Sequence, residues 1–502
     1  MNLFSQIRAA IKSPGKTFLE TAADGPLTYA DMLVRSAQIA NVLLARGVKP
    51  GDRIAAQVEK TPENLLLYLA ALRAGAVYLP LNTAYTLAEL DYFIGDAEPS
   101  LIVCDPGKQA GLAEIAGKRS VRAVETLDAS GKGSLTDAAA TASTEFSDVA
   151  REDSDLAAIL YTSGTTGRSK GAMLTHDNLA SNAKTLVDTW RFTDKDVLLH
   201  ALPVYHTHGL FVASNTVMLS GGSMIFLQKF DADEVMRLLP KATSMMGVPT
   251  FYTRLLKHAG LTRAACAHMR LFTSGSAPLL AETHIEFKDK TGHAILERYG
   301  MTETNMNTSN PYDGDRIAGT VGFPLPGVDL RITDPDTGKI LPQGETGGIE
   351  VKGPNVFPGY WRMPEKTKAE FRADGFFITG DVGKIDDRGY VHIVGRAKDL
   401  IITGGFNVYP KEIESEIDAL PGVAESAVIG CPHPDFGEGV TAVIVCKPGV
   451  NLSEKAVIGV LEQRLAKFKL PKRVIFMDDL PRNTMGKVQK NILRDRHAKL
   501  YG

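Results

Sequence analysis

The chain has 502 residues, of which 44% are hydrophobic and 23% charged, and its formal net charge is −2. That length exceeds what one hydrophobic core usually supports, so at least two domains are expected. The near-neutral charge lacks the basic field typical of nucleic-acid-binding proteins, and no sequence run approaches the roughly 20 apolar residues that span a bilayer. The four cysteines, Cys104, Cys266, Cys431 and Cys446, form no CxxC pair. We therefore expect a cytoplasmic protein with no nucleic-acid or membrane partner.

The first half of the chain alternates predicted helices and strands. An amphipathic first helix is expected within residues 4–13, and Thr28 with Asp31 forms a capping-box pattern ahead of a second helix. Thr61 and the proline after it open a third helix. Short apolar runs predict buried strands at residues 54–58, 77–81, 101–105 and 155–160. This alternation is typical of an α/β fold with largely parallel, doubly wound sheets, and the Gly/Ser/Thr-rich residues 128–144 are expected to form a surface excursion.

The residue pattern of the sequence changes after Gly322. Short alternating runs punctuated by Gly, Pro and Asp predict a small β-barrel-like subdomain. A final α+β block follows, with a helix expected from Pro410 and another from Ser453 to Lys467. We expect a large N-terminal domain over residues 1–396 and a smaller, mobile α+β domain over residues 397–502.

The segment YTSGTTGRSKG, residues 161–171, predicts a phosphate-binding loop. Its glycines allow the backbone N–H groups and hydroxyls to surround phosphate oxygens, and the lysine adds a point charge. It is not a Walker A loop, because Ser169 stands where that motif has glycine. The candidate nucleotide-binding residues here are Thr162, Ser163, Gly164, Thr165, Thr166 and Lys170.

Four further motifs follow in order: YGMTE at 299–303, TGD at 379–381, GRAKD at 395–399 and PRNTMGK at 481–487. With the loop, they resemble the adenylate-forming (ANL) superfamily of acyl-CoA synthetases, luciferases and peptide-synthetase adenylation domains. The resemblance spans nearly the whole chain. It implies a reaction in which a carboxylate attacks the α-phosphorus of ATP to give an acyl-adenylate, which the thiol of CoA then attacks.

The resemblance also implies a role for individual residues. Lys487 is the catalytic lysine between the carboxylate and the α-phosphate, and Glu303 is the Mg²⁺ ligand, a hard carboxylate that suits this cation. Lys398 is the hinge about which the C-terminal domain rotates between the two half-reactions. The remaining implied contacts are Thr302 with the α-phosphate, Tyr299 with adenine, Asp381 and Arg396 with ribose, the adenine-side loop Gly275, Ser276 and Ala277, and the CoA-side loop Gly404, Gly405 and Phe406.

Two arginines bear on the identity of the acid. Arg298 precedes the YGMTE motif and Arg254 lies in VPTFYTRLL, and either guanidinium can hold a second carboxylate bidentately. His206, His208 and Ser276 would add neutral donors, and Met301 would limit pocket length; the two histidines are not expected to bind metal. This set resembles malonyl-CoA synthetases, which implies malonate, and also methylmalonate, as the acid. The alternative for both arginines is an ion pair with a protein acid such as Glu297 or Asp315.

Competing interpretations remain at this point. The acid could instead be oxalate or a medium-chain fatty acid. A carrier-protein-loading adenylation module or a non-enzymatic binding relative would belong to another class, although no carrier motif is visible and Lys487, Glu303 and Lys170 are all present. The favoured prediction is a malonate–CoA ligase, monomeric or weakly self-associating, that uses ATP, Mg²⁺ and CoA and has only small-molecule partners.

Overall fold

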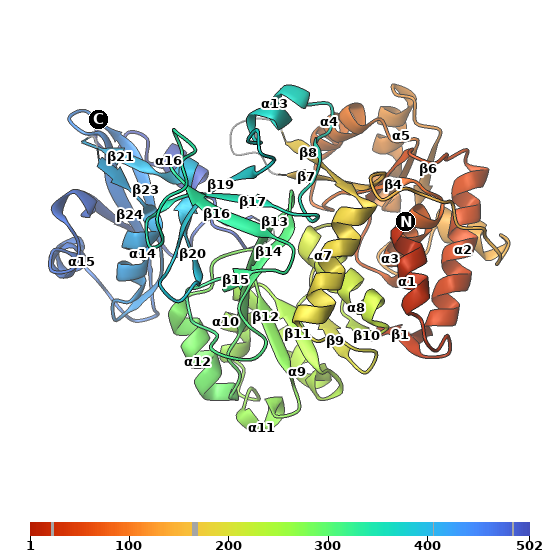
Figure 1. The fold of residues 1–502 in the computed structure, drawn as a ribbon, viewed down its shortest axis with the longest axis horizontal. Helices are drawn as coiled ribbons and strands as arrows, with labels where there is room; N and C mark the ends of the chain where they lie inside the picture. Colours follow the sequence, from red (N-terminus) through yellow and green to blue (C-terminus); the bar gives the residue numbers. More distant parts are fainter. Residues whose placement is uncertain (22–24, 163–168, 405, 484–485) are drawn as a thin grey trace.

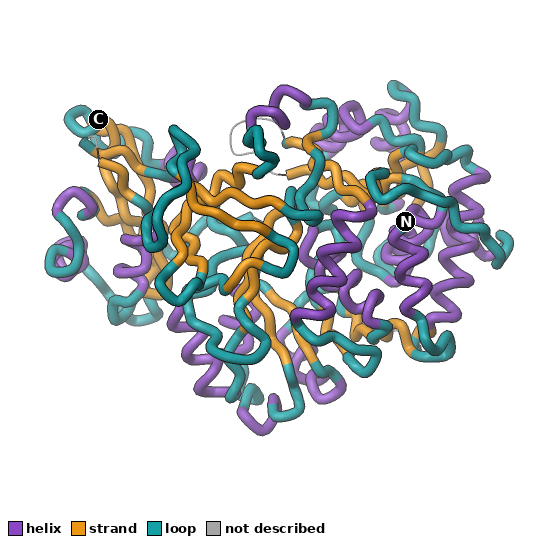
Figure 2. Tube along the Cα trace, in the orientation of Figure 1, coloured by secondary structure: helices purple, strands orange, loops and turns teal. Residues whose placement is uncertain are grey.

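The computed structural model describes residues 1–21, 25–162, 169–404, 406–483 and 486–502. Figure 1 shows a large N-terminal part, red to green, and a smaller C-terminal part in blue beside the central β-rich region. The tube in Figure 2 shows strands at the centre of both parts, with helices packed around those of the large part. The predicted fold class is therefore confirmed. Among the described residues, no helix has the length and apolar character that a membrane crossing requires.

One large sheet has seven strands in the order β18-β8-β7-β4-β3-β5-β6. The pairs from β7 to β6 are parallel, whereas β8 and β18 join antiparallel. Its strands are β3 (Arg53–Gln57), β4 (Val77–Pro80), β5 (Leu101–Cys104), β6 (Ala123–Thr126), β7 (Leu156–Thr162), β8 (Lys170–Thr175) and β18 (Gly359–Tyr360). The four predicted apolar strands correspond to β3, β4, β5 and β7, and the predicted phosphate loop connects β7 to β8.

The second large sheet has nine strands in the order β15-β14-β13-β12-β11-β9-β10-β1-β2. Its central pairs are parallel, and the largest hydrophobic core contains residues from both large sheets. The strands are β1 (Thr17–Glu20), β2 (Leu27–Thr28), β9 (Val197–His200), β10 (Ser223–Phe226), β11 (Ser244–Gly247), β12 (Leu271–Ser274), β13 (Leu296–Met301), β14 (Asn305–Ser309) and β15 (Phe323–Pro324).

Helices cover these sheets, and the early ones begin where their caps predict. Thr28 forms a capping box with Asp31, and Thr61 caps the helix that starts with Pro62. The helices of the large part are α1 (Leu3–Ala10), α2 (Tyr29–Ala45), α3 (Pro62–Arg73), α4 (Leu87–Ala97), α5 (Gln109–Gly117), α6 (Ser134–Ala140), α7 (His176–Thr189), α8 (Asn215–Ser220), α9 (Ala232–Leu238), α10 (Pro249–Leu256), α11 (Arg263–Cys266) and α12 (Ala281–Thr291), with 3₁₀ turns η1 (Pro106–Lys108) and η3 (Leu239–Lys241) and a π-helix, η2 (His208–Ser214).

Two predicted boundaries differ from the structure. The excursion at residues 128–144 contains α6, whose Leu135 is buried and which packs on α2, because the alanines beside this leucine favour helix. The helix expected to run from Ser453 to Lys467 ends as α15 (Glu454–Leu461). Beyond it the chain turns so that Phe468 stacks on Phe406, with ring centroids 4.7 Å apart.

Two smaller sheets complete the molecule. A four-stranded antiparallel sheet contains β16 (Asp329–Thr333), β17 (Gly347–Lys352), β19 (Phe377–Ile385) and β20 (Val391–Arg396), in that order, with α13 (Pro364–Ala369) nearby in the chain. The C-terminal sheet contains β21 (Ile401–Thr403), β22 (Phe406–Val408), β23 (Val423–His433), β24 (Gly437–Cys446) and β25 (Arg473–Phe476). Its helical elements are η4 (Ala397–Asp399), α14 (Pro410–Asp418), α15, η5 (Lys467–Lys469) and α16 (Lys490–Arg496).

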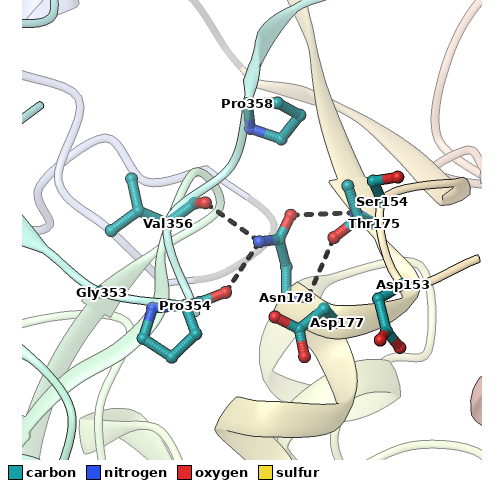
Figure 3. Close-up of a pocket in the computed structure, with 9 residues that line it drawn as sticks. All are labelled: Asp153, Ser154, Thr175, Asp177, Asn178, Gly353, Pro354, Val356 and Pro358. Carbon is teal, nitrogen blue, oxygen red and sulfur yellow. Dashed lines mark hydrogen bonds between the residues drawn. The ribbon is translucent and has the colours of Figure 1, made fainter. Parts of the chain in front are cut away.

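Helix α7 holds the loop that follows β17. Figure 3 shows the Asn178 side chain between the two segments: its Nδ2 donates to the carbonyls of Pro354, at 2.8 Å, and Val356, at 3.0 Å. Its Oδ1 accepts from the backbone N–H of Thr175 at 2.9 Å. These residues line an open pocket of about 310 Å³. The next residue of the loop, Phe357, donates its N–H to the carbonyl of Glu303 at 2.8 Å, so Asn178 steadies a segment that supports this candidate site residue.

We expect Asn178→Ala to lower the free energy of unfolding of the large domain by about 1–3 kcal/mol, because three backbone groups lose their partner. Both tryptophans, Trp190 and Trp361, lie in this part of the chain, so their fluorescence during urea unfolding measures the effect. Gln109→Ala, which removes an exposed amide on α5, is the matched control and should change the midpoint little. Equal midpoints for the two variants would contradict this account of the loop.

Candidate active site

The motifs that are distant in sequence meet where β13, β19 and β20 approach the C-terminal part. Asp381 and Arg396 are directly paired in the register of β19 and β20, and Arg396 Nε lies 2.8 Å from Asp381 Oδ1. The Tyr299 hydroxyl donates to Asp381 Oδ2 at 2.6 Å. Burial, reinforced by the Asp381 carboxylate, raises the pKa of Tyr299 well above its usual value, so the hydroxyl stays protonated and donates. The Asp381 carboxylate is thereby fixed in orientation, and it keeps lone pairs that can accept hydrogen bonds from the two hydroxyls of a diol.

Lys487 sits in a hairpin at the C-terminal end of the chain. Its N–H donates to Asn483 Oδ1 and its carbonyl accepts from the Asn483 N–H, both at 2.9 Å. Gly486 has φ +75°, and a Cβ on it would lie 3.3 Å from Thr250 Cγ2 of α10, so this hairpin approaches the large domain closely. The contact places the Lys487 amine close enough to other charged groups to be perturbed by them.

The charged groups that affect the Lys487 amine belong in part to the cluster around Asp381. Burial lowers the pKa of Lys487, Arg396 lowers it further, and Asp381 and Asp399 oppose the shift. The side chain nevertheless retains solvent exposure. The lysine is therefore surrounded by protein yet reachable, as a group that must contact a substrate should be.

Glu303 and Lys170 lie on either side of one tyrosine. The Tyr360 hydroxyl is 2.9 Å from Glu303 Oε1 and 2.7 Å from Glu370 Oε2. Lys170 Nζ lies 4.1 Å from the centroid of the Tyr360 ring and 3.3 Å from Glu370 Oε1. Burial raises the pKa of Glu303, and the nearby cations Lys170 and Arg396 oppose that shift. This arrangement brings a phosphate-loop cation and a candidate metal ligand to one place.

Sequence reasoning missed Tyr360 and Glu370. The pairing of β18 with β8 brings Tyr360 opposite Ala172, two residues from Lys170, and no local pattern in the sequence signals that contact. The predicted loop residues Ser163, Gly164, Thr165 and Thr166 lie outside the described residues, whereas Thr162 pairs with Lys170 at the base of the loop.

Arg298 forms one wall of a second, adjacent cluster. Its side chain is only 4% exposed, and its Nε and Nη2 have no hydrogen-bond partner in the described structure. Burial lowers its pKa to about 9. The proposed protein partners are engaged elsewhere: Glu297 faces His284 at 3.4 Å, and Asp315 pairs with Arg388 at 3.0 Å. The ion-pair alternative for Arg298 is therefore wrong for both named acids.

Two histidines lie close enough to this guanidinium for its charge to affect them. His208 Nδ1 lies 3.1 Å from Ser276 Oγ, and its Nε2 is buried without a partner among the described residues. His206 Nδ1 accepts from the His208 N–H at 3.2 Å. Burial, with Arg298 adding to it, lowers the pKa of both histidines, that of His206 to about 4, so both are neutral near pH 7. The cluster can accommodate an anion without a competing protein carboxylate.

Other predicted residues have less support from contacts. Arg254 is exposed on α10 and makes no ion pair with any residue the structure describes. Met301 and Thr302 are half-buried at the end of β13. Ala277 follows Ser276, whose φ of +70° is strained for a residue with a side chain. Strain of this kind often accompanies a functional turn.

The predicted CoA-side loop lies in the C-terminal sheet. Gly404 has φ +58°, and a Cβ there would approach Phe436 Cδ1 to 3.3 Å. Phe406 is 55% exposed despite its stack on Phe468, and Gly405 falls outside the described residues. In Figure 1, β21 lies at the outer edge of the C-terminal part, away from β13. Lys398 lies in η4, which connects β20 of the four-stranded sheet to β21 of the C-terminal sheet.

Comparison with known proteins gives consistent matches over the full chain. The family model described as AMP-binding enzyme matches residues 7–361, and that of the AMP-binding enzyme C-terminal domain matches residues 412–487. A feruloyl-CoA synthase of Amycolatopsis is 37% identical over 98% of this chain and 98% of the relative, and a malonate–CoA ligase of Arabidopsis thaliana is 34% identical over 97% and 86%.

The structural comparison is closer. The crystal structure of ATP-bound MatB from Rhodopseudomonas palustris is 67% identical, covers 100% of this chain and 99% of that one, and has a TM-score of 0.98. The apo structure of the same protein superposes with a TM-score of 0.87. The present structure thus superposes more closely on the ATP-bound form than on the apo form.

Lys398, the predicted hinge residue, provides a test of the site's electrostatics. Burial and then Arg396 lower the pKa of Lys398 to about 8. Because acetic anhydride modifies only neutral amines, competitive labelling read by mass spectrometry should give Lys398 half-maximal reactivity near pH 8. Arg396→Met removes a like charge, favours the ammonium form and should move that midpoint to higher pH. An unchanged or lower midpoint would refute the assignment.

Proposed function

The chain belongs to the AMP-binding enzyme family. We propose that it ligates malonate, and its 2-methyl homologue methylmalonate, to CoA, and that it cleaves ATP to AMP and pyrophosphate in doing so. The malonate–CoA ligase relative and the ATP-bound structural neighbour support this assignment. The observation that carries it is Arg298, a buried guanidinium whose Nε and Nη2 have no partner among the described residues.

The energetics of Arg298 require an anion from outside the protein. An unpaired buried charge costs several kcal/mol, and a partner carboxylate offsets much of that cost. Malonate supplies one carboxylate to the reaction and leaves the other for the guanidinium, which can bind it through two parallel N–H donors. An apolar tail would leave the cation uncompensated, which disfavours a medium-chain fatty acid.

The first half-reaction needs positioning rather than a general base, since the attacking carboxylate is already anionic. Lys487 places its ammonium between that carboxylate and the α-phosphate, reducing their repulsion and stabilising the charge that develops on the transferring group. Asp381 accepts the ribose hydroxyls in the orientation that Arg396 and Tyr299 impose. Lys170, beside Tyr360, binds the outer phosphates.

The residues present fit a magnesium ion. Glu303 offers a buried carboxylate close to Lys170, and the described part of the chain holds no group of three or more His, Cys, Asp or Glu side chains that could bind a metal ion by itself. Such a site suits Mg²⁺, which keeps waters and takes substrate phosphates besides one or two carboxylates. When bound, the ion neutralises phosphate charge.

In the second half-reaction the CoA thiol attacks the acyl carbonyl and AMP leaves. We infer a rotation of residues 397–502 about Lys398, which withdraws Lys487 and brings the loop at Gly404, Gly405 and Phe406 to the adenylate. The greater similarity to the ATP-bound neighbour than to its apo form supports assigning the present arrangement to the first half-reaction.

The direct test is AMP formation with ATP, Mg²⁺ and CoA across malonate, methylmalonate, succinate, oxalate, acetate and octanoate. We expect turnover of malonate and methylmalonate and rejection of acetate by about 10⁴-fold, because an analogue lacking the second carboxylate leaves buried polar groups unpaired. Efficient turnover of acetate or octanoate would contradict the proposal. AMP formation that persists without CoA, with acyl transfer to a carrier, would favour the loading module.

The two arginines can be separated by a matched pair of variants. Arg298→Met should lower kcat/KM for malonate by about 10²–10³-fold, since losing one partner of a buried charge pair costs about 2–5 kcal/mol. Arg254→Met, which changes an exposed guanidinium, should have a much smaller effect. A larger loss of kcat/KM in the Arg254 variant would indicate that the distal carboxylate binds to Arg254 on α10 instead.

A further inference from the structure

The strand register places a glycine directly beside Arg298. In the parallel pair of β12 and β13, Thr273 lies opposite Leu296 and Ser274 opposite Glu297. Gly275 follows the last residue of β12 and Arg298 is the next residue of β13, so continuing this register places the two side by side on one face, on chains about 4.8 Å apart. The guanidinium lies across the backbone at this point.

The Gly275 position has no room for a side chain. A Cβ built on it would lie 2.0 Å from Arg298 Nη1, 2.2 Å from Cζ and 2.7 Å from Nε. These are the three nearest atoms, and all belong to the guanidinium. At Gly300, by contrast, the obstacle is backbone, because a Cβ there would lie 1.8 Å from the carbonyl oxygen of Asn305.

Backbone conformation does not account for this glycine. The φ of Gly275 lies outside the left-handed range that favours glycine, in contrast to its neighbour Ser276 at +70°. An alanine could adopt the backbone conformation, and such a replacement often stabilises a protein slightly. What glycine supplies here is therefore space for the guanidinium.

We propose that Gly275 is a specificity-determining residue, because the space left by its missing side chain sets the position of the Arg298 guanidinium that binds the distal carboxylate of the acid. The inference rests on the proposed function, since it requires a dicarboxylate substrate. It gives Gly275 a role distinct from the adenine contact that the family resemblance implies. The position acts on the acid through Arg298, so it is a positioning residue.

The consequence of adding one methyl group follows from the mobility of its neighbour. The guanidinium is the end of a flexible side chain and makes no ion pair with any acid that the structure describes, so Gly275→Ala displaces Arg298 rather than the backbone. A displacement of about 1 Å at a reacting or binding group can lower the rate about 100-fold. The fold and the ATP contacts at Asp381 and Arg396 stay unchanged.

The experiment is a double-mutant cycle of Gly275→Ala and Arg298→Met, measured as AMP formation with malonate and with ATP varied separately. We expect Gly275→Ala to lower kcat/KM for malonate about 100-fold in the parent and to have no further effect in the Arg298→Met background, with KM for ATP unchanged. Gly459→Ala, in α15 where a Cβ meets nothing within 4 Å, controls for the glycine-to-alanine change itself.

Each outcome decides between roles. The same loss in both backgrounds, or a rise in KM for ATP with malonate turnover retained, would overturn the inference and favour the adenine-side role. Should Gly275→Ala unfold the protein, the double variant must recover the unfolding midpoint of Arg298→Met; failure to recover it overturns the inference as well. A parent protein inactive on malonate contradicts the proposed function and this inference with it, whereas an active parent with an equally active Gly275→Ala variant overturns this inference alone.

Discussion

A positive charge buried inside the large domain, with no ion-pair partner among the described residues, is the constraint on which the rest of the site depends. Arg298 cannot be neutralised by proton loss near pH 7, even though burial lowers its pKa to about 9. The surrounding residues respect that charge: Glu297 faces the other side of its strand, and the histidines next to the pocket are held neutral. The fold thereby maintains an electrostatic deficit that an anionic ligand removes, and this links the stability of the pocket to substrate recognition.

On the predicted nucleotide side of the site, by contrast, Asp381 and Lys170 each have a charged partner in the described structure. Asp381 is held by Arg396 and Tyr299, and Lys170 by Glu370 and the ring of Tyr360. Charge-paired groups are rigid before the nucleotide arrives, so little side-chain entropy is lost on binding. In the proposed function the two halves of the site thus differ: the nucleotide binds groups that already have partners, whereas the acid supplies the missing half of an ion pair.

Local sequence signals predicted the fold class and many element starts, because caps, glycines and apolar runs act over a few residues. Thr28 and Asp31 mark α2, and Thr61 with Pro62 marks α3. Contacts between distant segments escaped: Tyr360 reaches Lys170 only through the pairing of β18 with β8. The exposure of Arg254 depends on how α10 packs, which sequence does not fix. The sequence does allow the direction of Glu297 to be predicted. Adjacent residues of a strand point to opposite faces, so Glu297 cannot share a pocket with its neighbour Arg298.

The approach of Gly486 to Thr250 has a consequence for the direction of the reaction. With Lys487 in its proposed role, the centre that makes the adenylate exists only while the two parts of the chain touch. The proposed rotation that admits the thiol would separate them, and pyrophosphate would then find no catalyst with which to reverse the first step. Under that proposal the intermediate is committed to the thiol by geometry, and the contact between the two parts of the chain enforces the order of two successive steps.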